Sequence, residues 1–219
     1  MSIKHKYFRD RNFQLDQNNS RDYMAQREME TISLLLKYFY DFNFCEGLNI
    51  LDLGAGDKFL KNEILKRKCK YFSLDIHDLD FEKDIFNLEN DKFDIVMCLS
   101  VLEHLRDPSK FMSEILRVLK INGFIYLETP NWTYCKDIFY DDPTHQRPYT
   151  PKALENLLKI YEFKDIIITP NLRCKKKWWY YGNFKYFKAR YLLPFTNEKK
   201  YIPSFLKGKS KGLFGLAKK

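Results

Sequence analysis

The sequence predicts an α/β fold in which a mainly parallel β-sheet is covered by helices on both faces. Two observations lead to this prediction. Short apolar, β-branched runs alternate along the chain with segments whose apolar residues recur at spacings of three and four. The chain has 219 residues, 45% of them hydrophobic, which is enough for one substantial core and not for two. We therefore expect a single domain spanning residues 1–219.

Four segments have the apolar spacing of amphipathic helices. In the first of them, Ala25, Met29, Ile32 and Leu36 fall on one face. In the last two, a proline follows a residue that can cap a helix, and proline is favoured at the first helical position. The expected helices cover residues 21–40, residues 58–68, residues 108–120 and a segment that starts at Thr150-Pro151.

Six segments have the composition of short buried strands. They are residues 49–53, 71–76, 93–100, 124–129, 163–169 and 212–217. We divide the chain accordingly into an N-terminal helical segment (1–47), a core (48–171), an insertion (172–210) that fits the alternation poorly, and a last strand (211–219).

Charge is distributed unevenly along the chain, although its net value is +9. Residues 171–219 carry 14 Lys and Arg against a single acid, Glu198, and 12 residues of this tail are aromatic. Such a segment suits an acidic partner: nucleic acid, anionic lipid or a phosphorylated substrate. Five scattered Cys without a CxxC spacing argue against a disulfide framework or a structural zinc site. With neither a secretory signal nor a membrane-spanning segment in the sequence, we expect a cytoplasmic protein.

A glycine-containing loop follows the first expected strand. In Leu51-Asp52-Leu53-Gly54-Ala55-Gly56, the two glycines permit a tight turn and let a ligand lie against the backbone. Asp75 ends the next strand, where a carboxylate can accept hydrogen bonds from both hydroxyls of a ribose. A pyrophosphate fits less well, because Asp57 stands where a dinucleotide site would have its third glycine. The pattern favours a nucleoside without phosphate, attached to a cation.

Five motifs occur in order and with ordinary spacing over residues 48–170: LDLGAGDKF, SLDIHD, DIF, FDIVMCLSVLEHLRDP and LRVLKINGFIYLETPN. Together they resemble class I S-adenosylmethionine-dependent methyltransferases, and most closely the small bacterial type 11/12 group. The resemblance implies a Rossmann-like, seven-stranded, mostly parallel sheet whose last strand is antiparallel. It also implies S-adenosyl-L-methionine as cofactor.

The same resemblance assigns cofactor-binding roles to ten residues. Those that border the methionine part are Asp52, Gly54, Ala55 and Gly56. Asp75 would hold the ribose, and Ile76 would pack on the adenine. Asp84 would face the adenine amino group with Ile85 beside it, and Leu99 and Ser100 would end a strand next to the cofactor.

The acceptor side is expected at two loops. Glu103-His104 follows strand 93–100 and either places the substrate or packs as a loop cap. In the loop 141–149, His145 is a candidate general base, because histidine side chains in general can exchange a proton near neutral pH. Asp142 could orient it. Arg147 and Tyr149 are further substrate candidates. Relatives that bind magnesium near this point use additional acids, which Ser100-Val101-Leu102 do not provide, so we expect no metal.

Methyl transfer from a sulfonium needs only an aligned nucleophile and, for a hydroxyl, a base. We therefore expect a methyltransferase that acts on an oxygen of a sugar, a glycolipid or another small metabolite. The basic aromatic cap, residues 173–211, would contact an anionic membrane surface. Two alternatives stay open: an RNA methyltransferase that uses this tail, and a non-catalytic module that binds a nucleoside or a membrane surface.

Overall fold

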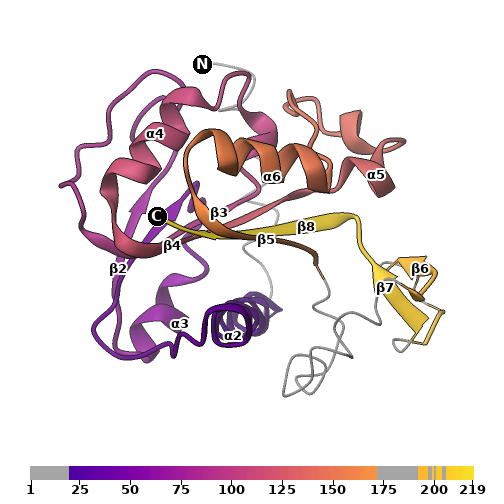
Figure 1. Cartoon of the computed structure of the whole chain (residues 1–219), viewed down its shortest axis with the longest axis horizontal. Coiled ribbons are helices and arrows are strands. Elements are labelled where there is room, and N and C mark those ends of the chain that lie inside the picture. Colours follow the sequence, from indigo (N-terminus) through magenta and orange to yellow (C-terminus); the bar gives the residue numbers. More distant parts are fainter. Residues whose placement is uncertain (1–19, 172–191, 197–198, 200, 204–205) are drawn as a thin grey trace.

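A computed structural model describes residues 20–171, 192–196, 199, 201–203 and 206–219. Its centre is a six-stranded sheet of order β2-β1-β3-β4-β8-β5 (Figure 1). The strands are β1 (Asn49–Leu53), β2 (Lys70–Leu74), β3 (Phe93–Leu99), β4 (Leu119–Pro130), β5 (Lys164–Pro170) and β8 (Gly212–Lys218). β1 to β4 pair in parallel, whereas β8 is antiparallel to both β4 and β5. The predicted fold class is confirmed, with six strands in the described sheet rather than the seven that the resemblance implied.

The segment after β2, residues 75–92, forms turns instead of a further strand. Side chains of α4 (Ser109–Val118) bind its backbone. Arg117 donates to the carbonyl oxygens of Phe86 (2.9 Å) and Leu88 (2.8 Å), and Glu114 accepts from the Phe86 amide (2.9 Å). Burial alone would raise the pKa of Glu114, but the hydrogen bonds from Arg117 and the Phe86 amide outweigh it and lower that pKa. The Arg117–Glu114 pair therefore anchors the backbone of residues 86–88 to α4.

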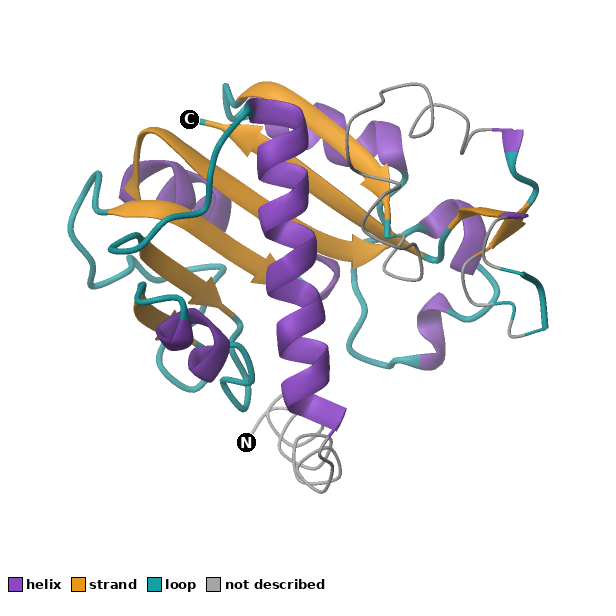
Figure 2. Cartoon of the chain, turned by 90° about the horizontal axis from the view of Figure 1, so that it is seen from below, coloured by secondary structure: helices purple, strands orange, loops and turns teal. Residues whose placement is uncertain are grey.

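Helices cover both faces of the sheet, as predicted. α2 (Ser20–Tyr40) and α3 (Lys61–Lys66) lie on one face, and α4 and α6 (Pro151–Ile160) on the other (Figures 1 and 2). The predicted apolar face of α2 is fully buried at Ala25, Met29, Ile32 and Leu36. α3 (Lys61–Lys66) is shorter than the expected 58–68. Lys58 and Lys68, at the two ends of the expected range, have positive φ values of 58° and 56°, which keep both residues out of the helix.

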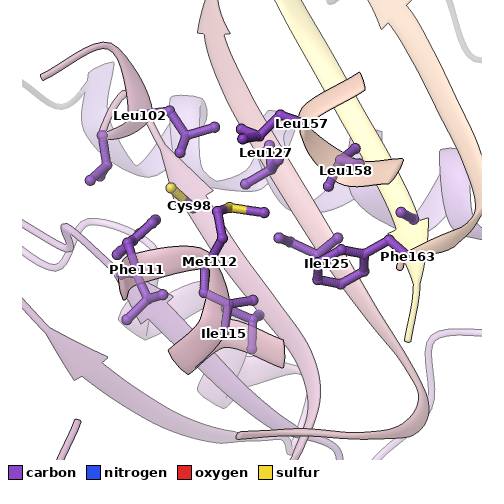
Figure 3. Packing of buried hydrophobic residues seen from close by; sticks show 14 of the residues in the cluster. Cys98, Leu102, Phe111, Met112, Ile115, Ile125, Leu127, Leu157, Leu158 and Phe163 are labelled. Atoms are coloured by element: carbon purple, nitrogen blue, oxygen red, sulfur yellow. The ribbon is translucent and has the colours of Figure 1, made fainter. Parts of the chain in front are cut away.

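The larger core cluster lies between the sheet and helices α4 and α6 (Figure 3). Phe111, Met112 and Ile115 of α4 and Leu157 and Leu158 of α6 face the strands. Opposite them, Cys98 of β3 and Ile125 and Leu127 of β4 are fully buried. This packing fixes the two central strands whose ends carry the candidate site.

Part of the predicted insertion 172–210 is described as a two-stranded parallel pair, β6 (Phe195–Thr196) and β7 (Lys207–Lys209). Its end joins the loop after β4, because Asn131 donates its backbone N–H to the Lys211 carbonyl oxygen (2.6 Å). The short helix α5 (Trp132–Cys135) follows there, with Lys209 Nζ 5.9 Å from the Tyr134 ring centre. Residues 172–191, 197–198, 200 and 204–205, which together hold more than half of the predicted basic aromatic cap, lie outside the described residues.

In the described part of the chain, every helix is too short or too polar to cross a membrane.

Candidate functional site

The glycine loop after β1 has the tight geometry that its sequence predicts. Gly54 and Gly56 have φ values of 73° and 53°, in the region that glycine tolerates best. Gly54 donates its N–H to the Leu74 carbonyl oxygen at the end of β2 (2.8 Å). Gly56 donates its N–H to Asp75 Oδ2 (2.6 Å), which leaves Oδ1 as a second acceptor on that carboxylate. The loop and the predicted ribose-binding acid therefore form one unit.

Gly54 also contacts the next strand end. A Cβ atom at this position would lie 2.2 Å from Cγ2 of Val101, a distance that no real contact allows. Val101 immediately precedes the short 3-10 helix η1 (Leu102–His104). The glycine loop and the Glu103-His104 pair are therefore neighbours at the carboxyl-terminal edge of the sheet, where ligands of open α/β sheets bind.

Asp52 is buried beneath this loop, with 2% of its surface exposed. It accepts a hydrogen bond from the Tyr71 hydroxyl (3.0 Å). Burial raises the pKa of Asp52 to about 7; the bond from Tyr71 lowers it, and the charges of Asp75 and Asp57 raise it further. Asp52 is thus a carboxyl group that a nearby cation would ionise.

This pKa predicts a pH-dependent cost in stability. An unfolded aspartate titrates near pH 4, so between about pH 4 and 7 the folded protein holds a proton that the unfolded chain has lost. The contribution of Asp52 to the free energy of unfolding is therefore largest below about pH 4 and decreases as the pH rises to about 7. We expect Asp52→Asn to be more stable than wild type at pH 7.5 by up to about 4 kcal/mol.

The measurement is urea denaturation of both proteins at pH 4.5, 6 and 7.5. The two proteins share all other titrating groups, so only the difference between them is informative. A difference that stays constant over this range would contradict the raised pKa.

The other predicted cofactor residues differ in exposure. Ile76 is half-buried, whereas Ile85 is 66% exposed. Asp84 accepts a bond from the Asp80 amide (2.7 Å) and so stabilises its own turn. Leu99 ends β3, and Ser100 follows it with a φ of 55° and donates its N–H to the Glu128 carbonyl oxygen (2.9 Å). Their predicted contacts with the cofactor remain predictions.

Asp57, the departure from the usual glycine pattern, has a structural role that the sequence did not reveal. Its carboxylate forms an ion pair with Arg21 of α2 (2.7 Å), and both side chains are 20% exposed. The Arg21 guanidinium also lies 5.6 Å from the Phe59 ring centre. Residues 36 positions apart thus join the start of α2 to the glycine loop.

The acceptor side contains a buried polar cluster formed by Glu103, His104 and His145 (hereafter the Glu-His-His cluster). One potential ligand atom from each lies within 4.8 Å of the others. Glu103 is 1% exposed and accepts from the Thr129 hydroxyl (3.1 Å). Burial raises the pKa of Glu103 to about 8, although hydrogen bonds from its own backbone N–H and from Thr129 oppose this.

Two backbone bonds bring the loop 141–149 onto η1. The amides of Gln146 and Arg147 both donate to the Glu103 carbonyl oxygen, at 2.7 and 3.0 Å. As a result the ring centres of His104 and His145 lie 4.8 Å apart. The sequence predicted a role for each histidine separately, and the fold brings them together.

Asp142 is linked to His104 through Thr144 and also lies near His145. It lies 3.9 Å from Nε2 of His145, beyond hydrogen-bonding distance, and instead accepts from the Thr144 hydroxyl (2.6 Å). That hydroxyl contacts Nδ1 of His104 (2.9 Å), and Nδ1 of His145 contacts the Phe139 carbonyl oxygen (2.6 Å). The expected orienting role of Asp142 toward His145 stays a prediction, and the Asp142–Thr144–His104 chain is a connection that the sequence did not reveal.

Both substrate candidates in this loop make contacts within the protein. Arg147 is exposed and donates to the Arg106 carbonyl oxygen (2.9 Å). Tyr149 is 3% exposed and belongs to the larger core cluster; burial raises its pKa, and Arg147 opposes this. Aromatic rings that the sequence did not single out lie beside His145. The ring centre of Phe139 is 4.4 Å from that of His145, and Trp132 and Tyr140 pack on Phe139.

Comparisons with known proteins identify the family of the chain. The sequence matches the family described as "Methyltransferase domain" over residues 5–167. It is 25% identical over 121 residues to the ubiquinone biosynthesis O-methyltransferase of Hydrogenovibrio crunogenus, covering 46% of this chain and 50% of that protein. It is 26% identical over 130 residues to the tRNA U34 carboxymethyltransferase of Campylobacter jejuni, covering 59% of this chain and 38% of that protein. The chain thus spans half or less of the length of these curated relatives.

A solved structure supports the fold. The SAM-dependent methyltransferase of Archaeoglobus fulgidus superposes with a TM-score of 0.59 at 22% identity, covering 91% of this chain and 94% of that one. The family match includes β1 to β4, the glycine loop and the Glu-His-His cluster. The chain belongs to the methyltransferase-domain family and has the class I fold of S-adenosylmethionine-dependent methyltransferases.

Proposed function

We propose that the protein transfers a methyl group from S-adenosylmethionine to a hydroxyl oxygen of a small acceptor such as a sugar, a glycolipid or another metabolite. The observation that supports this most is the close approach of Gly54 in the glycine loop to Val101, the residue before η1. Through Gly54 and Val101 it sets a nucleoside-type site beside the Glu-His-His cluster.

The residues at the glycine loop fit this cofactor better than a dinucleotide. The Gly56 amide is already bonded to the Asp75 carboxylate, and the carboxyl groups of Asp52 and of Asp57, the latter paired with Arg21, lie close to it. Negative charge at this point repels a pyrophosphate and attracts a cation. When bound, the cofactor supplies an electrophilic methyl group on a positively charged sulfur.

We assign the acceptor contact to the Glu-His-His cluster, with His145 and His104 as the catalytic residues and Glu103 as a substrate-binding carboxylate. The acceptor oxygen forms the new C–O bond as the C–S bond breaks, and the hydroxyl proton leaves to this cluster. The name of the Hydrogenovibrio relative, an O-methyltransferase, favours oxygen as the acceptor atom. Arg147, Tyr149 and the cofactor contacts of Ile76, Asp84, Ile85, Leu99 and Ser100 remain part of the proposal.

One further observation favours a second candidate, an RNA methyltransferase. The tail 171–219 carries 14 basic residues, and the Campylobacter relative is named for a tRNA nucleoside. On the main proposal, the same charge draws the protein to an anionic membrane surface at the cytoplasmic face. An RNA substrate instead predicts binding that weakens steeply with salt.

The test is production of S-adenosylhomocysteine from S-adenosylmethionine with four acceptor classes: phenols, free sugars, a glycolipid in vesicles and total tRNA. We expect turnover with one of the first three, and a loss of at least about 100-fold in kcat for His145→Asn with unchanged cofactor affinity. His77→Asn, an exposed histidine outside the cluster, is the matched control. Turnover with tRNA alone would replace the proposal by its rival, and turnover with none of the four would favour a non-catalytic module.

A further inference from the structure

We propose that Glu103, His104 and His145 bind one divalent first-row transition-metal ion, and that the acceptor oxygen binds the same ion. The inference rests on the proposed function for its role, but the site itself stands on geometry. The sequence argued against a metal because Ser100, Val101 and Leu102 add no acid to Glu103-His104. The fold supplies the missing ligand from another loop, 41 residues after His104.

The three side chains are close enough to share an ion. Their potential ligand atoms lie within 4.8 Å of one another, whereas ligands of one ion lie about 3 Å apart. A small inward movement of the side chains closes that difference. Two residues belong to η1 and the third to a loop bonded to Glu103 through two amides, so the backbone already holds the site together.

Hydrogen bonds at Nδ1 leave Nε2 of each imidazole as the nitrogen that can bind an ion. A carbonyl oxygen can only accept, so the short contact between His145 Nδ1 and the Phe139 carbonyl places a proton on Nδ1. The Thr144 hydroxyl donates to Asp142 and therefore accepts from Nδ1 of His104. In the neutral form each ring thus carries its lone pair on Nε2. Metal-binding histidines are oriented in this way by a carbonyl or a carboxylate.

The charge around the cluster favours a cation. Glu103 is almost fully buried, and among the residues that the structure describes it makes no salt bridge with Lys or Arg. The nearby carboxylates of Glu128 and Asp142 add further negative charge. A buried carboxylate needs a charged or strongly hydrogen-bonded partner, and the Glu103 carboxylate accepts a side-chain hydrogen bond from the Thr129 hydroxyl.

The ligand set selects the ion. Two imidazoles and one carboxylate suit Zn²⁺, Mn²⁺ or Fe²⁺ better than Mg²⁺ or Ca²⁺, which prefer oxygen ligands. Three protein ligands leave positions open for the acceptor. An ion there lowers the pKa of a hydroxyl that binds it, so the hydroxyl becomes a better nucleophile for the methyl group. Both histidines would then hold the ion, and the hydroxyl proton would pass to solvent water as the C–O bond forms, instead of to an imidazole.

The test is calorimetric titration of the full-length, EDTA-treated protein with ZnCl₂, without cofactor or acceptor. We expect one ion per chain, and at least tenfold weaker binding for His145→Ala and for Glu103→Gln, which keeps the shape of the side chain. His77→Ala and Cys45→Ser are the matched controls, because both change exposed potential ligands outside the cluster. Cobalt absorption spectra should lack a thiolate charge-transfer band.

Three results would overturn the site. They are the absence of zinc binding by folded wild-type protein, zinc binding that survives in both cluster variants, and zinc binding that is lost with Cys45→Ser. Circular dichroism and affinity for S-adenosylhomocysteine show whether each variant is folded. Because the titration needs no turnover, a chain that binds zinc but methylates nothing would leave this site standing and reject the proposed function. A chain that methylates an acceptor without binding zinc would support the proposed function and reject the metal site.

Discussion

Replacing Gly54 by alanine should destabilise the protein by about 3 kcal/mol and abolish cofactor binding at concentrations that saturate wild type. Two costs combine. Alanine must adopt a φ of 73°, and its Cβ would lie 2.2 Å from Cγ2 of Val101 in a fully packed region. Relief of that clash moves the glycine loop or η1, and the proposed site uses both. Urea denaturation and a calorimetric titration with S-adenosylhomocysteine measure the two effects.

Gly47→Ala is the matched control for this variant. Gly47 has a similar φ of 83°, but an added Cβ would meet no atom within 4 Å. It should therefore show only the backbone cost of about 1–2 kcal/mol and retain cofactor binding. The double variant Gly54→Ala, Val101→Ala should recover the steric part. Equal losses for Gly47→Ala and Gly54→Ala would show that the contact with Val101 is unimportant.

Replacing Arg117 by alanine should cost about 3 kcal/mol of unfolding free energy. The loss leaves Glu114, which is 5% exposed, with only the longer ion pair to Lys110 (3.7 Å) in place of the pair at 2.6 Å. It also removes the Arg117 donor from the Leu88 carbonyl oxygen and leaves the Phe86 carbonyl oxygen with the Leu88 amide alone (2.7 Å). Arg117→Lys should recover little, because an ammonium group cannot reproduce the several bonds of the planar guanidinium. The measurement is urea denaturation of both variants.

Arg67→Ala provides the comparison. Arg67 forms an ion pair of the same length with Glu63 and has the same side-chain exposure to within 1%, at 26% against 27% for Arg117. However, Glu63 keeps Lys66 as a second partner, and Arg67 bonds only within its own helix. We expect a loss below about 1 kcal/mol for Arg67→Ala. If the two alanine variants were equally destabilised, the bonds from Arg117 to the backbone of Phe86 and Leu88 would not contribute to stability.

Local sequence patterns predicted most of the fold. The spacing of Ala25, Met29, Ile32 and Leu36 placed α2 and its buried face correctly. Thr150 and Pro151 marked the start of α6, where the Thr150 side chain accepts from the Ala153 amide (3.2 Å). Such signals depend on neighbouring residues in the chain, and therefore they can be read from the sequence.

The features that the sequence did not predict depend on contacts between distant residues. Nothing near His104 indicates that His145 lies 4.8 Å from it, because two amides on a remote loop produce that approach. Likewise, Arg117 lies 31 residues from the Phe86 carbonyl that it binds. The Arg21–Asp57 pair could be suspected only from the acid that replaces a glycine. The resemblance located the glycine loop and Asp75, and the structure shows how they are joined.

The central claim is that the edge formed by the glycine loop and Asp75 binds a methyltransferase cofactor. The most direct measurement is a calorimetric titration of wild type and Asp75→Ala with S-adenosylhomocysteine. The account predicts low-micromolar binding to wild type, weakened at least tenfold in the variant, or by about 1.4 kcal/mol, because Asp75 both anchors the Gly56 amide and offers an acceptor to the ribose. Absence of binding by folded wild-type protein, or equal affinity in the two proteins, would contradict it.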